Sequence, residues 1–411
     1  MAVIHKFNHF ALGWDKIGQV AAISLAFVIP ISTALTSIFA GLVLLSWLLG
    51  PNQTEKRRIL CHHPLVGWLY PLVILTLLGI FYSSGDPQNI RHSVGDGLRL
   101  CFIPIFIYCY QSKVVSKAAL WAFASAMILT LILAFLKVYA GLPIGLKYTT
   151  GAVFKSHIKT SYFMAIAAFF LAFQLPYVAK QYRLILCVII SLMIFYLLFM
   201  SVGRIGYITL VACLLAMAWQ KSRVKGLVVA SMMAVVMVIG AYTTSNVFHD
   251  RINLLAQDLD FYHQGGRLLE SSLGSRIQFA LTSTSLLFER PFFGWGTGGF
   301  EAAYAKFHEG EATLFTDNPH NEYLLKGVEF GLVGLCFLLL LFYKQWRLST
   351  QIPIELRGFY QGVLLTFVIG CFLNSWLKDS AEGYFFCVMT AICFAALPLS
   401  VQPKLVKATL H

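Results

Sequence analysis

The residue best suited to chemistry in this sequence is His320, which lies just before a long apolar run from Leu324 to Tyr343. Asparagine is a favoured helix cap and proline fits the first helical position. Asn318 and Pro319 therefore predict a helix start that places His320 in the first turn. The positive end of a helix dipole favours the neutral imidazole that a general base requires. A lone histidine is otherwise more often a structural hydrogen-bonding residue.

A polar, glycine-rich segment, Pro291–Tyr323, contains this histidine in an otherwise apolar chain. Glycine lets the backbone turn sharply or approach a ligand closely. The segment therefore predicts a loop beside His320, and both a binding role and a simple turn stay open. Its closely spaced glycines are Gly294, Gly296, Gly298 and Gly299.

Two arginines occupy positions where a phosphate group could bind. Arg204 lies at the junction of two apolar runs, where an arginine either serves function or extends to lipid headgroups. Arg276 follows Ser275, and Gln278 completes the form of a capping box, which predicts a helix from here to about Glu289. A cation at a helix start is unfavourable unless an anion binds beside it. The alternative for Arg276 is an ordinary solvated side chain.

Acidic residues lie in the polar turn between the last two apolar runs. Asp379 follows Lys378 there, and Glu382 is the next acid along the chain. Asp379 could orient His320, bind a sugar hydroxyl, or pair with Arg204 as plain structure. The residue pattern leaves these three roles open.

A metal site has little support in the sequence. Asp258 and Asp260 form a D-x-D pattern, but they fall within a helical pattern over Val247–Phe261 that points the two carboxylates to different faces. The chain has no CxxC pair and no His/Cys cluster with zinc spacing. We therefore expect no metal.

The composition indicates an integral membrane protein. Hydrophobic residues make up 58% of the chain and charged residues only 12%, which excludes an ordinary soluble protein. The formal charge of +13 comes from short basic clusters between apolar runs. Such clusters mark membrane topology and do not form a nucleic-acid-binding surface.

The apolar runs predict an all-α protein with about twelve transmembrane helices. They divide it into nine N-terminal helices in residues 1–242, a polar interval in residues 243–322 with short helices, and three C-terminal helices in residues 323–411. Within the interval, Val247–Phe261 is expected to lie on the membrane surface. The predicted spans are Ile17–Leu35, Ser37–Leu49, Pro64–Tyr82, Val94–Tyr110, Ala118–Gly141, Thr160–Val178, Leu184–Met200, Gly203–Trp219, Gly226–Tyr242, Tyr323–Tyr343, Gly358–Leu377 and Tyr384–Leu399.

Lysine and arginine predict the orientation, because cytoplasmic loops are enriched in both. With both termini in the cytoplasm, clusters such as Lys56-Arg57-Arg58 lie inside. The interval 243–322, Arg204 and Asp379 then lie outside. An exception is the outer loop with three lysines, Lys147, Lys155 and Lys159.

The motif G-x-G-x-x-x-F from Gly294 to Phe300, followed by H-N-E-Y-L at His320, resembles the O-antigen ligase family of polytopic membrane glycosyltransferases. The similarity is densest over Arg276–Gly334, with weaker similarity around Arg204 and Asp379. The resemblance implies a GT-C-like helical architecture in the bacterial inner membrane. It also implies an inverting, metal-independent transfer without a cofactor. The implied donor is undecaprenyl diphosphate-linked O-antigen, and the implied acceptor is a sugar of lipid A-core.

The resemblance also implies roles for individual residues. His320 would act as the base or position the acceptor, and Asp379, or alternatively Glu382, would be the functional acid. Arg204 and Arg276 would bind the diphosphate. Supporting roles fall to Gly294, Gly296, Lys378 and Asn321, and Asn321 either orients His320 or caps the helix.

Three other functions fit parts of the pattern. An O-antigen polymerase would use the same donor with a second lipid-linked glycan as acceptor. A protein O-oligosaccharyltransferase shares the glycine and histidine features but usually has a longer C-terminal portion. A flippase or transporter would place broken helices near mid-membrane, whereas the charges here cluster at one face.

Overall fold

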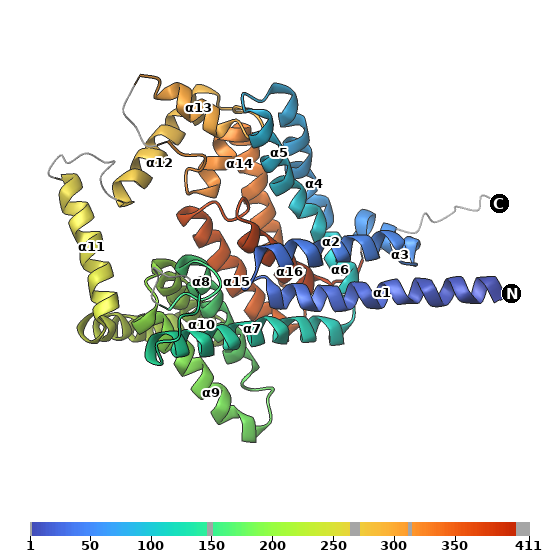
Figure 1. The fold of residues 1–411 in the computed structure, drawn as a ribbon, viewed down its shortest axis with the longest axis horizontal. Coiled ribbons are helices and arrows are strands. Elements are labelled where there is room, and N and C mark those ends of the chain that lie inside the picture. Colours follow the sequence, from blue (N-terminus) through green and yellow to red (C-terminus); the bar gives the residue numbers. More distant parts are fainter. Residues whose placement is uncertain (1, 146–150, 264–271, 311–314, 400–411) are drawn as a thin grey trace, which may run out of the picture.

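The computed structural model describes residues 2–145, 151–263, 272–310 and 315–399, and these residues form helices without any strand. Short turns and the small helices η1 (Val66–Trp68), η2 (Gly79–Tyr82), η3 (Arg99–Cys101) and η4 (Tyr196–Met200) join the longer ones (Figure 1). The longer helices are α1 (Ala2–Val28), α2 (Thr33–Leu49), α3 (Gln53–His62), α4 (Tyr70–Leu78), α5 (Pro87–Leu98), α6 (Phe102–Cys109), α7 (Lys113–Tyr139), α8 (His157–Gln174), α9 (Lys180–Phe195), α10 (Arg204–Thr244), α11 (Asn246–His263), α12 (Ser272–Glu289), α13 (Phe300–Phe307), α14 (Glu322–Ser349), α15 (Ile354–Leu373) and α16 (Ser380–Phe394).

In the described part of the chain, five helices are long and apolar enough to cross a membrane, or six if the bent pair α2 and α3 is one span. They confirm a helical membrane protein but not the predicted number of about twelve spans. One reason is that several apolar runs are divided. The predicted span Val94–Tyr110 is broken at η3, where Arg99 is buried between α5 and α6.

Helix α10 accounts for a further part of the difference, because it contains two of the predicted spans. A straight helix of its 41 residues would be about 60 Å long. Yet the Tyr207 hydroxyl, near its start, donates to the carbonyl of Ser201, and the Ser245 hydroxyl, at its end, donates to the carbonyl of Leu198. Both ends therefore lie beside one short segment. The non-helical backbone at Ser222 and Arg223 turns the chain back, as a two-span hairpin requires.

The core forms around α16, which contacts α2, α6 and α15 and is buried along most of its length. Trp376, in the turn before α16, is fully buried against Tyr162 of α8 and Phe367 of α15. A Cβ atom on Gly370 of α15 would overlap the indole ring. This glycine therefore lets the turn from Asn374 to Asp379 sit against the bundle.

The polar interval folds into α11, α12 and α13. Helix α11 confirms the helix predicted over Val247–Phe261, while its position on a membrane surface stays a prediction. The capping-box interpretation is wrong, because α12 begins at Ser272 and includes Ser275 and Arg276 in its first turns. The side chains of Asp258 and Asp260 lie outside the described residues. The division into 1–242, 243–322 and 323–411 also stays a prediction.

Helix α14 begins later than its sequence predicts. Asn321, not Asn318, is the N-cap, and its side-chain oxygen accepts from the backbone N–H of Leu324 at 3.0 Å. His320 therefore lies just before the helix and not in its first turn. Further along, α14 is broken at Gly331, which has a φ of +66°.

Candidate active site

The backbone of His320 adopts a left-handed conformation, which neighbouring side chains stabilise. Its φ is +53°, a conformation that costs a non-glycine residue about 1–3 kcal/mol unless local contacts offset it. The backbone N–H of His320 donates to Oδ1 of Asn318 at 2.9 Å, and the Ser375 hydroxyl donates to the same oxygen at 2.7 Å. Asn318 thus holds the loop before α14 against the turn before α16.

The imidazole of His320 contacts Asn374, and this contact selects its tautomer. His320 Nδ1 lies 2.9 Å from Asn374 Oδ1, and the Asn374 Nδ2 amide donates to Asp379 Oδ2 at 2.7 Å. An amide oxygen can only accept, so Nδ1 carries the proton and donates. His320 Nε2 is then left with a lone pair, as a base requires. The asparagine links His320 to Asp379.

A half-buried lysine holds Asp379, the far end of this hydrogen-bonded chain. Lys159, near the start of α8, places Nζ 3.1 Å from Asp379 Oδ1 and 3.2 Å from Glu382 Oε2. The Glu382 side chain is 1% exposed and that of Asp379 is 28% exposed. Asp379 is thus the acid linked to His320 through Asn374, while Glu382 lies deeper and pairs with the same ammonium group.

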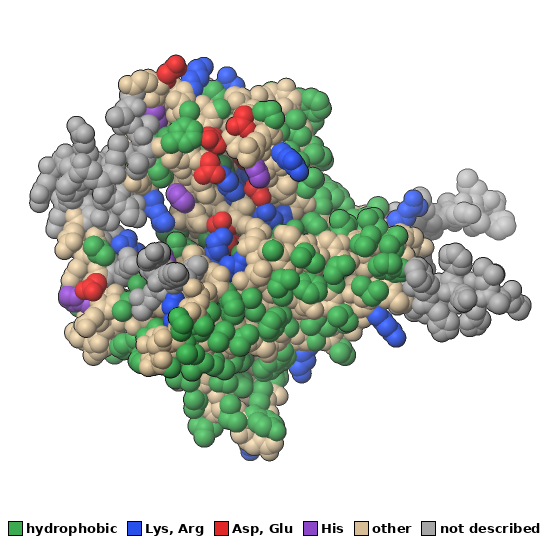
Figure 2. All heavy atoms as spheres, viewed as in Figure 1, with side chains coloured by type: hydrophobic (Ala, Val, Ile, Leu, Met, Phe, Trp, Pro, Cys, Tyr) green, Lys and Arg blue, Asp and Glu red, His purple; other side chains and the backbone are tan. Residues whose placement is uncertain are grey.

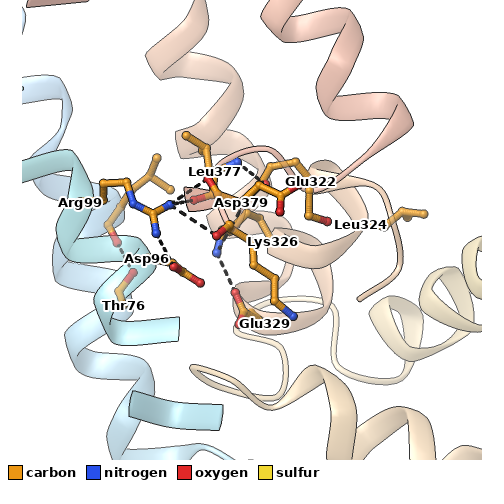
Figure 3. A network of polar contacts seen from close by, with 12 residues as sticks. Thr76, Asp96, Arg99, Glu322, Leu324, Lys326, Glu329, Leu377 and Asp379 are labelled. Atoms are coloured by element: carbon orange, nitrogen blue, oxygen red, sulfur yellow. Dashed lines mark hydrogen bonds and ion pairs between the residues drawn. The ribbon is translucent and has the colours of Figure 1, made fainter. Parts of the chain in front are cut away.

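A polar network anchors the turn that carries these residues (Figure 3). Arg99 Nη1 donates to the carbonyl of Leu377 at 2.6 Å and to that of Asp379 at 3.2 Å. The carboxylate of Glu322 accepts from the backbone N–H of Leu377 at 2.8 Å. Arg99 is held in turn by Asp96 at 2.6 Å. Backbone groups are thus fixed from both sides, which orders the turn.

The two arginines lie close to each other, and Arg276 reaches the turn that carries Asn374. Arg276 is half-buried, and its Nη1 is 3.4 Å from the carbonyl of Leu373, the residue before Asn374. Burial lowers the pKa of Arg276, and the nearby charge of Arg204 lowers it further. Within the described ranges, neither guanidinium lies within 4.0 Å of a carboxylate. Two adjacent cations with no carboxylate of the described residues within 4.0 Å form an anion-binding arrangement.

Comparison with known proteins finds a family that part of the chain resembles. Residues 186–339 match the family model described as O-antigen ligase. This match supports membership of the O-antigen ligase family and, in general, ligase- or polymerase-type handling of lipid-linked glycans. A search of curated proteins finds no match.

The glycine-rich segment is a packing element. Gly294, Gly296 and Gly298 all have positive φ, and a Cβ on any of them would collide with backbone atoms. The segment inserts between η2 and the break in α14. The backbone N–H groups of Trp295 and Gly296 donate to carbonyls in α14, each at 2.8 Å. The packing of Gly294 and Gly296 thus favours a role in a tight turn over a role in direct ligand contact.

Of the other supporting residues, Lys378 binds Asp317. Its Nζ contacts Asp317 Oδ2 at 2.9 Å and the Asp317 carbonyl at 2.6 Å. Burial opposes ionisation of Asp317, but the hydrogen bond and charge of Lys378 prevail, together with smaller contributions, and lower the pKa of Asp317. Lys378 therefore ties the loop before His320 to the turn before α16.

A polar cavity of about 410 Å³ lies beside Asp379. Of the four principal candidates, only Asp379 lines it. Figure 2 shows charged and histidine side chains gathered around a hollow in this face, with a largely hydrophobic surface below. The lining residues are Asn89, His92, Ser93, Asp96, Gly298, Phe300, Glu301, Asp317, Asn318, Leu325, Lys326, Glu329, Lys378 and Asp379.

Sequence reasoning did not assign a role to Asn374 or to Lys159. Asn374 belongs to no motif that we could interpret. One feature of the sequence could have pointed to Lys159. It is one of three lysines in a predicted outer loop, where the topology predicts few basic residues. In the described ranges, no group of three or more His, Cys, Asp or Glu residues could hold a metal ion. The absence of a metal requirement stays a prediction.

Proposed function

We propose that this protein is an O-antigen ligase. It transfers O-antigen from undecaprenyl diphosphate to a sugar hydroxyl of lipid A-core at the periplasmic face of the bacterial inner membrane. The observation that carries this proposal is the hydrogen-bonded chain of His320, Asn374 and Asp379 beside Arg276. It combines an oriented base with an anion-binding arrangement, which are the two groups this transfer needs.

The base acts on the acceptor. Nε2 of His320 takes the proton from the acceptor hydroxyl as its oxygen attacks the anomeric carbon. The bond from that carbon to the diphosphate oxygen breaks, and the sugar is transferred with inversion. Asp379 polarises the Asn374 amide and so favours the proton on Nδ1 of His320. Lys159 holds the Asp379 carboxylate in place.

The arginines act on the donor. Outside the inner membrane there is no nucleotide sugar, so a donor has to carry its own leaving group. A polyprenyl diphosphate does this, with the lipid in the bilayer and the diphosphate at the interface. Arg204 and Arg276 neutralise the diphosphate, and their effect increases as negative charge develops on the departing oxygen.

Deletion of the gene in its host, followed by electrophoresis of the lipopolysaccharide, tests this function. The expected result is complete core without any O-chain, together with accumulated lipid-linked polymer. Core that bears a single repeat would instead identify an O-antigen polymerase. An unchanged lipopolysaccharide pattern would exclude both activities.

A further inference from the structure

The cavity beside Asp379 has the size and the polar lining of a small-ligand site. It occupies about 410 Å³, within the range of about 300–1,000 Å³ typical of small-ligand sites. Residues of α5, the glycine-rich segment, α13 and α14 line it, together with the loop at Asp317 and the turn at Asp379. Only Phe300 and Leu325 contribute large apolar side chains, so an acyl chain does not fit its chemistry.

The lining is rich in hydrogen-bonding groups that are already fixed in place. Glu329, 2% exposed, accepts from the Gly298 N–H at 3.0 Å and from Lys326 Nζ at 2.8 Å. The Asn89 amide donates to Glu301 at 2.6 Å. Carboxylates and amides held in this way can bind the hydroxyl groups of a sugar without the cost of ordering mobile side chains.

The charge of the lining separates this cavity from the donor position. Its ammonium groups come from Lys326 and Lys378, and they are outnumbered by carboxylates. The ammonium groups of Lys326 and Lys378 are already paired with Glu329 and Asp317, so a diphosphate is expected at Arg204 and Arg276 instead. The carboxylates are those of Asp96, Glu301, Asp317, Glu329 and Asp379.

We infer that this cavity binds the acceptor saccharide through the hydroxyl groups of an uncharged sugar. The inference rests on the proposed transfer, because it assigns the second substrate of the same site. The donor diphosphate then lies at Arg204 and Arg276, and the acceptor sugar lies in the cavity beside Asp379. The attacking hydroxyl meets His320, whose backbone N–H is held by the cavity-lining Asn318. Phosphate-bearing sugars are disfavoured in the cavity.

Direct binding tests this inference without relying on transfer. The probe is a phosphate-free oligosaccharide released from lipid A-core, and saturation-transfer NMR measures its binding to the purified full-length protein. Ser93→Trp fills the cavity and Glu301→Gln removes a charge with little change of shape. We expect Ser93→Trp to weaken binding by roughly tenfold or more and Glu301→Gln to weaken it by less. Inorganic pyrophosphate is expected not to displace the saccharide.

The matched control is Gln19→Trp, in a separate polar cavity of about 520 Å³ lined by Asp15 and Tyr108 among others. It should leave saccharide binding unchanged. Thermal unfolding of each variant shows whether the protein is folded. If Ser93→Trp does not fold, the binding measured with Glu301→Gln tests the inference instead. Equal binding by wild type and both cavity variants, no binding by wild type, or displacement by pyrophosphate would each overturn the inference. Cavity-dependent binding in a protein that transfers no glycan would instead refute the proposed function alone.

Discussion

At the scale of single residues, the unusual feature is that an amide, not a carboxylate, holds His320. Asn374 can accept from the ring and donate to Asp379 at the same time, which a carboxylate in its place could not do. The tautomer of His320 is therefore set by an asparagine whose own orientation is set by Asp379. Each residue of this hydrogen-bonded series can be replaced separately by mutation.

Replacement of His320 by alanine should abolish most of the chemistry and spare donor binding. A general base contributes about 10²–10⁴-fold to a rate, so His320→Ala should lose transfer by that factor. Transfer with purified donor and acceptor, measured beside donor binding, checks this. The control is His249→Ala, in the same polar interval 243–322, which should have little effect on transfer. If His320→Ala retains more than roughly a tenth of wild-type turnover, His320 is only a structural residue.

Asn374→Ala should lower turnover without weakening donor binding, because it frees the imidazole of His320 but leaves the arginines intact. We expect a loss of roughly tenfold to a hundredfold, smaller than that of His320→Ala. Steady-state kinetics with separate variation of donor and acceptor measure it. Asn321→Ala is the matched control, since it removes a helix cap and should cost stability of about 0.5–2 kcal/mol but little turnover. Wild-type turnover in Asn374→Ala would contradict the assigned link.

Arg276→Lys should fall between wild type and Arg276→Ala in donor affinity. Lysine keeps the charge but loses the planar fork that contacts two phosphate oxygens at once. Binding of a polyprenyl diphosphate to the three proteins gives the order directly. An Arg276→Ala protein that binds and transfers normally would mean that Arg276 is an ordinary solvated side chain.

At the scale of elements, the site is built where helices break. The turn before α16 carries Asn374 and Asp379, the loop before α14 carries His320, and Ser375 and Lys378 connect the two. Trp376 anchors the turn in the core. The positions of the functional groups thus depend on packing between α15 and α16.

Gly370→Val should damage the site from inside the bundle. The added side chain would overlap the Trp376 ring, so the turn has to shift or the protein loses stability. We expect a destabilisation of about 1–3 kcal/mol with a disproportionate loss of turnover. Thermal unfolding and transfer assays on the same preparation separate the two effects. Gly41→Val in α2, where a Cβ would meet no atom within 4 Å, is the control. Equal behaviour of the two variants would show that the ring contact is unimportant.

At the scale of the whole molecule, the arrangement separates a polar working face from an apolar body. The exposed surfaces of α9 and α10 are rich in Leu, Ile, Val and Met, as lipid contact requires. The charged groups of the site, by contrast, lie on or beside the loops before α14 and α16. A substrate with a lipid tail and a polar head matches this division.

The predicted orientation can be tested by thiol labelling. Cys61 is exposed in the basic segment assigned to the cytoplasm, while Asp317 is exposed beside the site. A membrane-impermeant maleimide should therefore label Cys61 only in inverted vesicles or permeabilised cells. An Asp317→Cys protein that lacks Cys61 should be labelled in cells whose inner membrane is intact. The opposite pattern would place the site in the cytoplasm and refute the predicted topology.

The sequence by itself determined the membrane class, the helical content and the principal candidates. Apolar runs and basic clusters act locally, so they can be interpreted without knowing which segments meet. The motif around Gly294 and His320 sufficed for the family resemblance, which the match over residues 186–339 confirms. The helix over Val247–Phe261 was also predictable from its own periodicity.

Only the tertiary structure decided which side chains act together. His320 and Asn374 are 54 residues apart, and Lys159 and Asp379 are 220 residues apart, so no local pattern could pair them. The same reason explains the errors. Asn318 looks like a helix cap in isolation, but it binds Ser375 across the site, and Asn321 caps α14 instead. Helix ends, glycine roles and ion pairs depend on neighbours that packing alone brings into contact.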